Sequence, residues 1–156
     1  MHSFIRIATK NDVEPVARAM RVRDVEEIRA ASGQTPHAAL QEALEVSTYA
    51  WAVCDDTGPF ALFGVSPFVG DAGSPWMLAT GRVKFHKRIF IEDAPQYIQL
   101  MQDAYPILLN YVDARHIDSL RWLRRMGFRF TGFSPTYGFE RRPFFQFSKV
   151  SPCAHQ

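Results

Sequence analysis

Residues 107–128 read Ile-Leu-Leu-Asn-Tyr-Val-Asp-Ala-Arg-His-Ile-Asp-Ser-Leu-Arg-Trp-Leu-Arg-Arg-Met-Gly-Phe, and this stretch decides the fold class. Its first part, 107–112, is an apolar run with the length of a buried strand. Its second part, 117–126, predicts a helix because apolar residues recur every three positions, and Gly127 follows where helices often end. The face that we expect to pack on a sheet carries Leu120, Leu123 and Met126, and the opposite face carries Arg121, Arg124 and Arg125.

The residues just before this stretch complete a strand–helix–strand unit. Residues 76–80 predict a strand, and a helix is expected to begin at Asp93, with Gln96 at capping-box spacing, and to end at Pro106. Two strands joined by one helix are parallel neighbours with a right-handed crossover. We therefore expect strands 76–80 and 107–112 to lie side by side, with a V-shaped gap between them if the fold is of the type that the resemblance below implies.

Further strands and helices are predicted on both sides of this unit. They are a strand at 3–7, helices beginning after Thr9, at 24 and at Pro36, strands at 49–54 and 60–65, a break at 70–75, and strands at 128–133 and 144–149. The order predicts an α/β (α+β) three-layer domain over residues 1–150, with a mixed central sheet of about six or seven strands and helices on both faces. Residues 151–156, including Cys153, are expected to form a flexible tail.

Composition excludes several classes of protein. The 156 residues are 47% hydrophobic and 22% charged, as expected for one globular domain. No apolar run reaches the roughly 18 residues that span a bilayer, and the first residues lack the pattern of a secretion signal. Two cysteines supply neither a disulfide framework nor a four-thiolate zinc site, so a reducing cytosol is expected. A net charge of +2 does not favour nucleic acid as a partner.

The element order, with Arg6–Asp12 opening the first helix, resembles the GNAT acyltransferase fold. The sharper match is Asn110–Phe128, which resembles the late strand–helix segment of that fold ending in Gly-Phe. This segment, the 76–80 strand and Gln146-Phe147 are similar to the internal virion protein A family of short-tailed phages (podophages), a GNAT-like group of internal core proteins. The likeness covers about residues 46–149 and is densest over 105–149. It implies a phage or prophage origin.

The resemblance directs attention to the loop that holds the pyrophosphate of acetyl-CoA in GNAT enzymes, with the pattern Arg/Gln-x-x-Gly-x-Gly/Ala. The corresponding segment, 81–93, has one glycine, at the wrong end. Glu92 and Asp93 are expected to occupy the following helix N-terminus with carboxylates, which predicts a degenerate site. The alternative is a phosphate clamp made of side chains, and the candidate acetyl-CoA-binding residues are Leu78, Thr80, Lys84, Lys87 and Arg88. A solvated basic loop is the structural alternative.

Proton transfer is the second test of the resemblance. GNAT enzymes commonly place an Asn at the start of the last helix and, about two turns later, a Tyr that acts as the general acid. The matching residues here are His116 and Leu123. Leucine cannot donate a proton, which leaves His116, Ser119 and Asp113 as candidate catalytic residues. For His116 and Asp113 the structural alternatives are a helix-capping or surface residue and a loop-capping carboxylate. No metal is expected, because the histidines lack neighbours at ligand spacing.

Two functions fit these observations. The first is a virion-associated or virion-assembly protein with a GNAT-like fold, a degenerate acetyl-CoA site and no confident cofactor. The alternative is an acetyl-CoA-dependent N-acetyltransferase that modifies an amine on a host or phage protein, so whether the protein is an enzyme stays open. Expected partners are other virion or host proteins, with neither a membrane span nor sequence-specific nucleic acid. The expected location is the host cytoplasm, with packaging into the virion under the first hypothesis.

Overall fold

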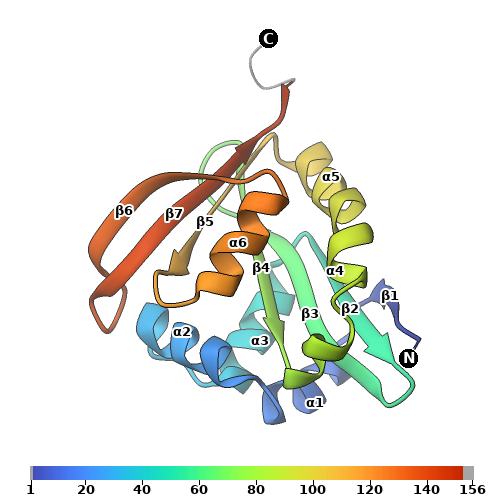
Figure 1. Ribbon diagram of the computed structural model, residues 1–156. Helices are drawn as coiled ribbons and strands as arrows, with labels where there is room; N and C mark the ends of the chain where they lie inside the picture. The colour runs from blue at the N-terminus through green and yellow to red at the C-terminus, as the bar shows by residue number, and fades with distance from the viewer. Residues whose placement is uncertain (1, 153–156) are drawn as a thin grey trace.

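The computed structural model describes residues 2–152, and a seven-stranded mixed sheet in the order β1-β2-β3-β4-β5-β7-β6 forms its centre (Figure 1). The strands are β1 Phe4–Ile7, β2 Tyr49–Asp55, β3 Gly58–Pro67, β4 Ala72–Ala79, β5 Ile107–Asp113, β6 Arg129–Tyr137 and β7 Arg142–Val150. The helices are η1 Lys10–Asp12, α1 Val13–Arg18, α2 Val22–Ser32, α3 Pro36–Val46, η2 Gly81–Phe85, α4 Ile89–Glu92, α5 Ala94–Ala104 and α6 Ile117–Arg125. The predicted strand number and order are confirmed.

Helices cover both faces of the sheet, as the sequence predicts (Figure 1). On one face α1, α2 and α3 pack against β2 and β3, with Val16, Leu40 and Leu62 fully buried. On the other face α5 and α6 contribute buried side chains to the cluster that contains Leu108 and Phe147 of the sheet, and α4 packs on β2 and β3. Burial of these apolar side chains on both faces is the main source of stability for such a three-layer arrangement.

β4 and β5 are parallel neighbours, as predicted, but they pair over two residues alone. The pairs are Ala72↔Ile107 and Gly73↔Leu108, at the start of each strand. Beyond them β4 continues on β3 through Ala79, and β5 continues on β7 through Asp113. The two strands therefore diverge toward their carboxyl ends and leave a V-shaped gap in the middle of the sheet (Figure 1).

β4 begins four residues earlier than the sequence indicates, inside the segment predicted to be a break. Pro75 is tolerated because it lies at a position of β4 whose backbone faces away from β3, so no ladder hydrogen bond needs its missing N–H. Gly73 is required where Tyr105 packs on the strand, since a Cβ there would lie 2.5 Å from the Tyr105 ring. Gly73 and Pro75 are therefore compatible with a strand at this position, and they do not mark a break in the sheet.

The predicted capping of the helix after β4 is wrong. The segment divides into α4 and α5, and Asp93 lies between them with no side-chain capping hydrogen bond. Glu92 is the last residue of α4, and its carboxylate pairs with Arg88 at 2.7 Å. Neither carboxylate therefore saturates a helix N-terminus, which removes the main reason for predicting a blocked anion site.

The predictions for α6 are confirmed. Leu123 and Met126 are buried against the sheet, while Arg121, Arg124 and Arg125 are exposed. Gly127 ends the helix with a φ of 91°, the left-handed conformation that glycine adopts without strain. At the C-terminus, Ser151 is buried and its N–H donates to the Pro106 carbonyl at 2.8 Å. Residues 153–156 of the predicted tail, including Cys153, lie outside the described residues.

Candidate functional site

The gap between β4 and β5 is held open by side chains that replace the missing strand pairing. Asn110 Nδ2 donates to the Pro75 carbonyl oxygen at 2.7 Å, and Asn110 Oδ1 accepts from the Tyr111 N–H at 2.8 Å. One residue earlier on each strand, the Ser74 hydroxyl donates to the Leu109 carbonyl at 2.9 Å. Asn110 thus satisfies one backbone group of each strand at the point where they separate.

The edge of β4 that faces the gap has one unpaired backbone position. At its end, the Ala79 N–H donates to Asp24 Oδ2 and the Ala79 carbonyl accepts from the Arg21 N–H, both at 2.9 Å. Alternation in the antiparallel β3–β4 pair then directs the N–H and C=O of Met77 toward the gap as well. Within residues 2–152, no protein group bonds either of them. Met77 therefore offers a donor and an acceptor to an extended ligand.

A cavity of about 400 Å³ passes through this gap and reaches both helical layers. Its walls are mostly apolar. On the side of α2 and α3 it is lined by Ile28, Ala31, Ala39, Ala43, Trp76, Leu78, Tyr111, Tyr137 and Phe144. On the side of α4, α5 and α6 it is lined by Met77, Ile89, Phe90, Tyr97, Ile98, Ser119, Trp122 and Leu123. Concave, largely apolar sites with a few polar groups are the usual form of small-molecule sites.

Glu27 is the ionisable residue whose environment fits acid–base chemistry. It lies on α2 among the cavity-lining residues, and its Oε1 accepts from the Asp113 N–H at 2.7 Å. Burial raises the pKa of Glu27 to about 7, although the Asp113 N–H acts in the opposite direction. The nearby carboxylates of Asp24 and Asp113 add to the increase. A carboxyl group poised near neutral pH can accept and release a proton during turnover.

The three catalytic candidates from the sequence lie near one another around the β5–α6 junction, but only Ser119 lines the cavity. Asp113 is fully buried, and its carboxylate binds the guanidinium of Arg115, with one contact at 2.6 Å. Burial alone would raise the pKa of Asp113, but hydrogen bonds from Arg115 outweigh it and hold the pKa below its usual range. This is the behaviour of the loop-capping carboxylate that was the structural alternative.

His116 is the residue before α6 and is buried, but its side chain makes no capping hydrogen bond. Burial lowers the pKa of His116, and Asp113 acts in the opposite direction. Its Nε2 has no hydrogen-bond partner within the described part of the chain. His116 stays a catalytic prediction, although it is not among the residues that line the cavity.

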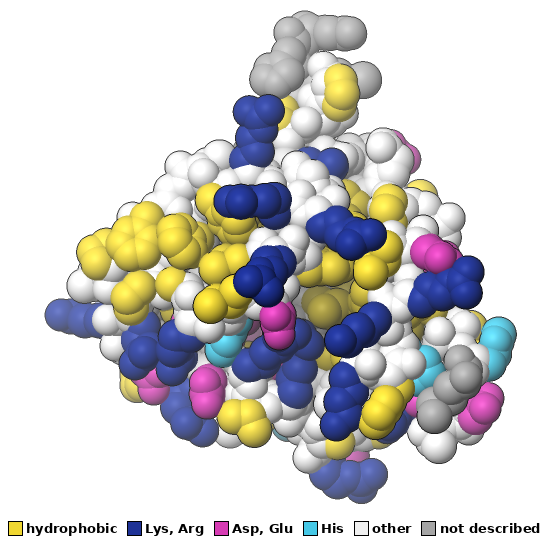
Figure 2. Space-filling view, viewed as in Figure 1, with side chains coloured by type: hydrophobic (Ala, Val, Ile, Leu, Met, Phe, Trp, Pro, Cys, Tyr) yellow, Lys and Arg dark blue, Asp and Glu magenta, His cyan; other side chains and the backbone are white. Residues whose placement is uncertain are grey.

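The cofactor candidates divide into two groups. Leu78 lines the cavity, whereas Thr80 is buried behind it, where its Oγ1 accepts from the Arg82 N–H at 3.3 Å. Lys84, Lys87 and Arg88 are exposed on the loop from β4 to α4. Figure 2 shows Lys and Arg side chains spread around apolar surface on the face formed by α4, α5 and α6. The exposed arginines of α6 belong to the same face, which gives it a positive field.

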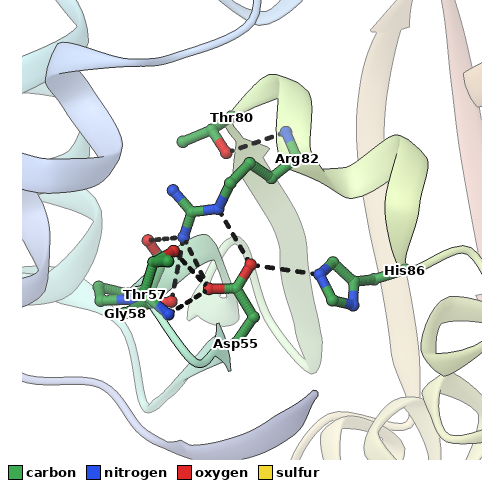
Figure 3. A network of polar contacts seen from close by, with 7 residues as sticks. Asp55, Thr57, Gly58, Thr80, Arg82 and His86 are labelled. Carbon is green, nitrogen blue, oxygen red and sulfur yellow. Dashed lines mark hydrogen bonds and ion pairs between the residues drawn. The ribbon is translucent and has the colours of Figure 1, made fainter. Parts of the chain in front are cut away.

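A buried polar network anchors the loop that carries these cations (Figure 3). Asp55, at the end of β2, accepts from Arg82 Nε at 3.0 Å and lies 3.2 Å from His86 Nε2. Burial alone would raise the pKa of Asp55, but hydrogen bonds from Thr57 and Arg82 hold it well below its usual range. The His86 ring also stacks on Phe60 at 4.5 Å between centroids. Lys84 and Lys87 flank His86 and are therefore displayed from a fixed segment.

Two residues of the site are absent from the sequence-based candidates. Glu27 sits in a run of charged residues on α2 that looks like a solvated helix face, so nothing local distinguishes it. Asn110 is the one polar side chain within the apolar run 107–112 and could have been noticed for that reason. Its hydrogen bonds to both strands show why a polar group stands there.

Solved structures with the same architecture include several acetyltransferases. A GNAT superfamily phosphinothricin acetyltransferase from Sinorhizobium meliloti in complex with acetyl-CoA matches with a TM-score of 0.77 and 13% identity, over 97% of this chain and 89% of that one. The ribosomal-protein-S5-alanine acetyltransferase of Vibrio fischeri has a TM-score of 0.69 and 16% identity, over 97% and 94%. Ard1 from Thermoplasma volcanium has a TM-score of 0.73 and 13% identity, over 97% and 99%.

At these identities the likeness shows the fold, and this chain has the GNAT-type α/β fold. No family model and no curated protein sequence matches the chain. Nothing in the comparisons supports the resemblance to internal virion proteins or a phage origin. Among residues 2–152 there is no helix long and apolar enough to cross a membrane, and no cluster of His, Cys, Asp and Glu arranged to hold a metal.

Proposed function

We propose that this protein is an acetyl-CoA-dependent N-acetyltransferase, the alternative of the two functions that fit its sequence. The observation that carries the proposal is the cavity through the sheet, bordered by the unpaired backbone of Met77 and by the Glu27 carboxyl group. A protein that had kept only the fold for assembly would have no need of a held-open gap or of a carboxyl group with a pKa near 7.

Acetyl-CoA fits the residues present. Its pantetheine arm is an extended chain with amide groups, which match the free N–H and C=O of Met77 as an added strand would. Its phosphates match the exposed cations on the α4, α5 and α6 face, including Lys87 and Arg88. These contacts would come from side chains, because the glycine-rich backbone loop of GNAT enzymes is missing in 81–93. Side chains of this kind are weaker and more mobile anion ligands than backbone N–H groups.

When bound, acetyl-CoA would supply the thioester carbonyl carbon, which bonds the acceptor nitrogen while the C–S bond breaks and CoA leaves as a thiolate. Glu27 accepts the proton that the attacking amine loses, and later releases it to solvent. The Asp113 N–H holds Glu27 Oε1, so the carboxylate keeps one orientation toward the cavity. The departing thiolate would take its proton from water, and the Ser119 hydroxyl on the cavity wall can relay that proton while it regains its own from water. General base catalysis by a positioned group contributes about 10²–10⁴-fold in rate.

Calorimetric titration with acetyl-CoA is the direct test. We expect one binding site per chain, weaker binding in the double variant K87A/R88A, and unchanged binding in Glu27→Gln. At ten times Kd, binding should stabilise the protein by about 1.4 kcal/mol, which raises Tm by roughly 3–6 °C. Absence of heat and of any Tm shift at millimolar acetyl-CoA would refute the proposal.

A further inference from the structure

The part of the cavity between α2, α3 and β4 has features that an acetyl-transfer site does not need by itself. Its walls are Ile28 and Ala31 of α2, Ala39 and Ala43 of α3, and Trp76 and Leu78 of β4. These residues lie across the sheet from α4, α5 and α6, where the exposed cations gather. The compartment is therefore on the acceptor side of the gap if acetyl-CoA enters from the basic face.

Small side chains keep this compartment open. On α3, Leu40 is fully buried and Leu44 packs beside it, so the large residues of that helix fill the core. Ala39 and Ala43, one turn apart on the same helix, border the cavity instead. Protein interiors are normally filled to crystal-like density, so space beside two alanines in an otherwise close-packed layer is available to a ligand.

Trp76 gives the compartment a rigid aromatic wall. Its indole Nε1 donates to the Ser47 hydroxyl at 2.8 Å, which fixes the ring at the C-terminal end of α3. The ring lies close to Gly64 of β3, where a Cβ would come within 3.1 Å of Trp76 Cζ2. The polar atom of the indole is therefore satisfied by the protein, and the remaining surface of the ring is apolar.

The charges around the compartment select against an acceptor that carries a carboxylate. Arg21 is the one Lys, Arg or His among the described residues that line the cavity, and its Nε is bound to Asp24 at 2.7 Å. The lining therefore sets one guanidinium against the two carboxyl groups of Asp24 and Glu27, and a carboxylate on the acceptor would be repelled more than it is attracted. An uncharged apolar group is accommodated, and an ammonium group is favoured beside Asp24 and Glu27.

Resting on the proposed function, we infer that the acceptor is a primary amine that bears an apolar or aromatic group and no carboxylate. Glu27 receives the amine, and the apolar group lies among Ala31, Ala39, Ala43 and Trp76. Ala31 is one helical turn from Glu27, about 5–6 Å along α2, so the group must be joined to the nitrogen through a short linker. The amino-terminal residue of a peptide and a free arylalkylamine both have this chemistry.

A panel of amines tests the inference through release of the CoA thiol. The probes are phenylalaninamide, a short peptide that begins with Phe, 2-phenylethylamine, free phenylalanine and glycinamide. We expect kcat/KM for phenylalaninamide to exceed the values for free phenylalanine and glycinamide at least tenfold. Preference for the peptide over 2-phenylethylamine would identify a polypeptide as the source of the amine, and the reverse preference a small molecule. Equal rates with free phenylalanine or glycinamide would overturn the inference.

A variant that fills the compartment locates the binding site. Ala43→Leu should raise KM for phenylalaninamide about tenfold or more and should remove most of the preference for phenylalaninamide over glycinamide. Ala38→Leu, on the exposed side of the same helix, is the matched control and should leave both the KM and the preference as in the wild type. An unchanged KM for phenylalaninamide in a folded Ala43→Leu protein would refute the placement of the apolar group.

Direct binding separates this inference from the proposed function. Calorimetry with phenylalaninamide alone reports the compartment whether or not the acetyl group is transferred. Binding that Ala43→Leu abolishes, together with no thiol release from any amine, would support the apolar site and refute the transferase. Thiol release without preference for apolar amines would do the opposite. Neither binding nor release would overturn both.

Discussion

Replacement of Glu27 by glutamine should remove activity and increase stability at the same time. The glutamine carbonyl can still accept from the Asp113 N–H, so the side chain keeps its place. The proton acceptor is lost, however, and kcat should fall about 10²–10⁴-fold. Because the exchange is nearly isosteric, Kd for acetyl-CoA should stay unchanged. Glu26→Gln is the matched control, since Glu26 points to Arg115, 3.8 Å away.

The stability effect follows from the pKa of Glu27. The native protein holds this proton up to about pH 7, whereas the unfolded chain releases it near the ordinary value of 4.5. Between these values the native state binds more protons, so the Glu27 contribution to stability is lost as pH rises from 4.5 to 7. At about 1.4 kcal/mol per pKa unit, Glu27→Gln should be up to about 3 kcal/mol more stable than wild type at pH 8.

Urea unfolding of wild type and Glu27→Gln at pH 4.5 and pH 8 measures this difference. The two proteins should have nearly equal free energies of unfolding at the lower pH and diverge at the higher one. For wild type, kcat at saturating amine and acetyl-CoA should rise through pH 7 and level off, and this inflection should be absent from the residual kcat of the variant. A variant with wild-type turnover, or with the same stability difference at both pH values, would refute the assignment of Glu27 as base.

Three further predictions concern the frame of the site. Leu123→Ala should lower the free energy of unfolding by about 2–5 kcal/mol in urea melts, because it empties a buried position, whereas exposed Arg124→Ala should change it by less than about 1 kcal/mol. Asn110→Leu leaves two backbone groups at the gap without partners, so it should destabilise by about 1–3 kcal/mol and weaken acetyl-CoA binding in calorimetry. Kd for acetyl-CoA should rise steeply with added NaCl in wild type and less steeply in K87A/R88A, because exposed cations are screened by salt; equal slopes would contradict a side-chain clamp.

Much of the fold could be predicted from the sequence because local signals and tertiary packing agree. The end of α6 at Gly127 is predicted correctly, and this glycine adopts a positive φ angle of 91°. The buried face of α6 was also predicted from the spacing of its apolar residues. In such segments the periodicity that defines the helix also defines the surface that packs on the sheet.

The functional site could be predicted only in part, because the gap in the sheet creates it. The spacing of the elements predicts the parallel pair of strands, but it does not predict that their pairing stops after Gly73. Beyond that point the Asn110 side chain bonds the Pro75 carbonyl, and these two residues lie 35 positions apart in the sequence. The capping-box pattern placed the start of α5 correctly at Asp93, but it did not show that α4, from Ile89 to Glu92, comes directly before it. The error was to expect the Asp93 carboxylate to cap the helix, since its side chain makes no capping hydrogen bond.

Under the proposed function, Glu27 explains why the missing glycine loop does not by itself argue against activity. Phosphate binding and proton transfer would depend on different elements: the loop after β4 displays the cations, while α2 and β5 hold the carboxylate. Loss of backbone anion contacts would weaken the hold on the nucleotide part of acetyl-CoA without altering the acid–base group. The carboxylate stays in place because Asp113, which positions it through a backbone N–H, is itself fixed by Arg115. The affinity for acetyl-CoA and the capacity for proton transfer would therefore depend on different residues. The cavity and Glu27 support the capacity for proton transfer.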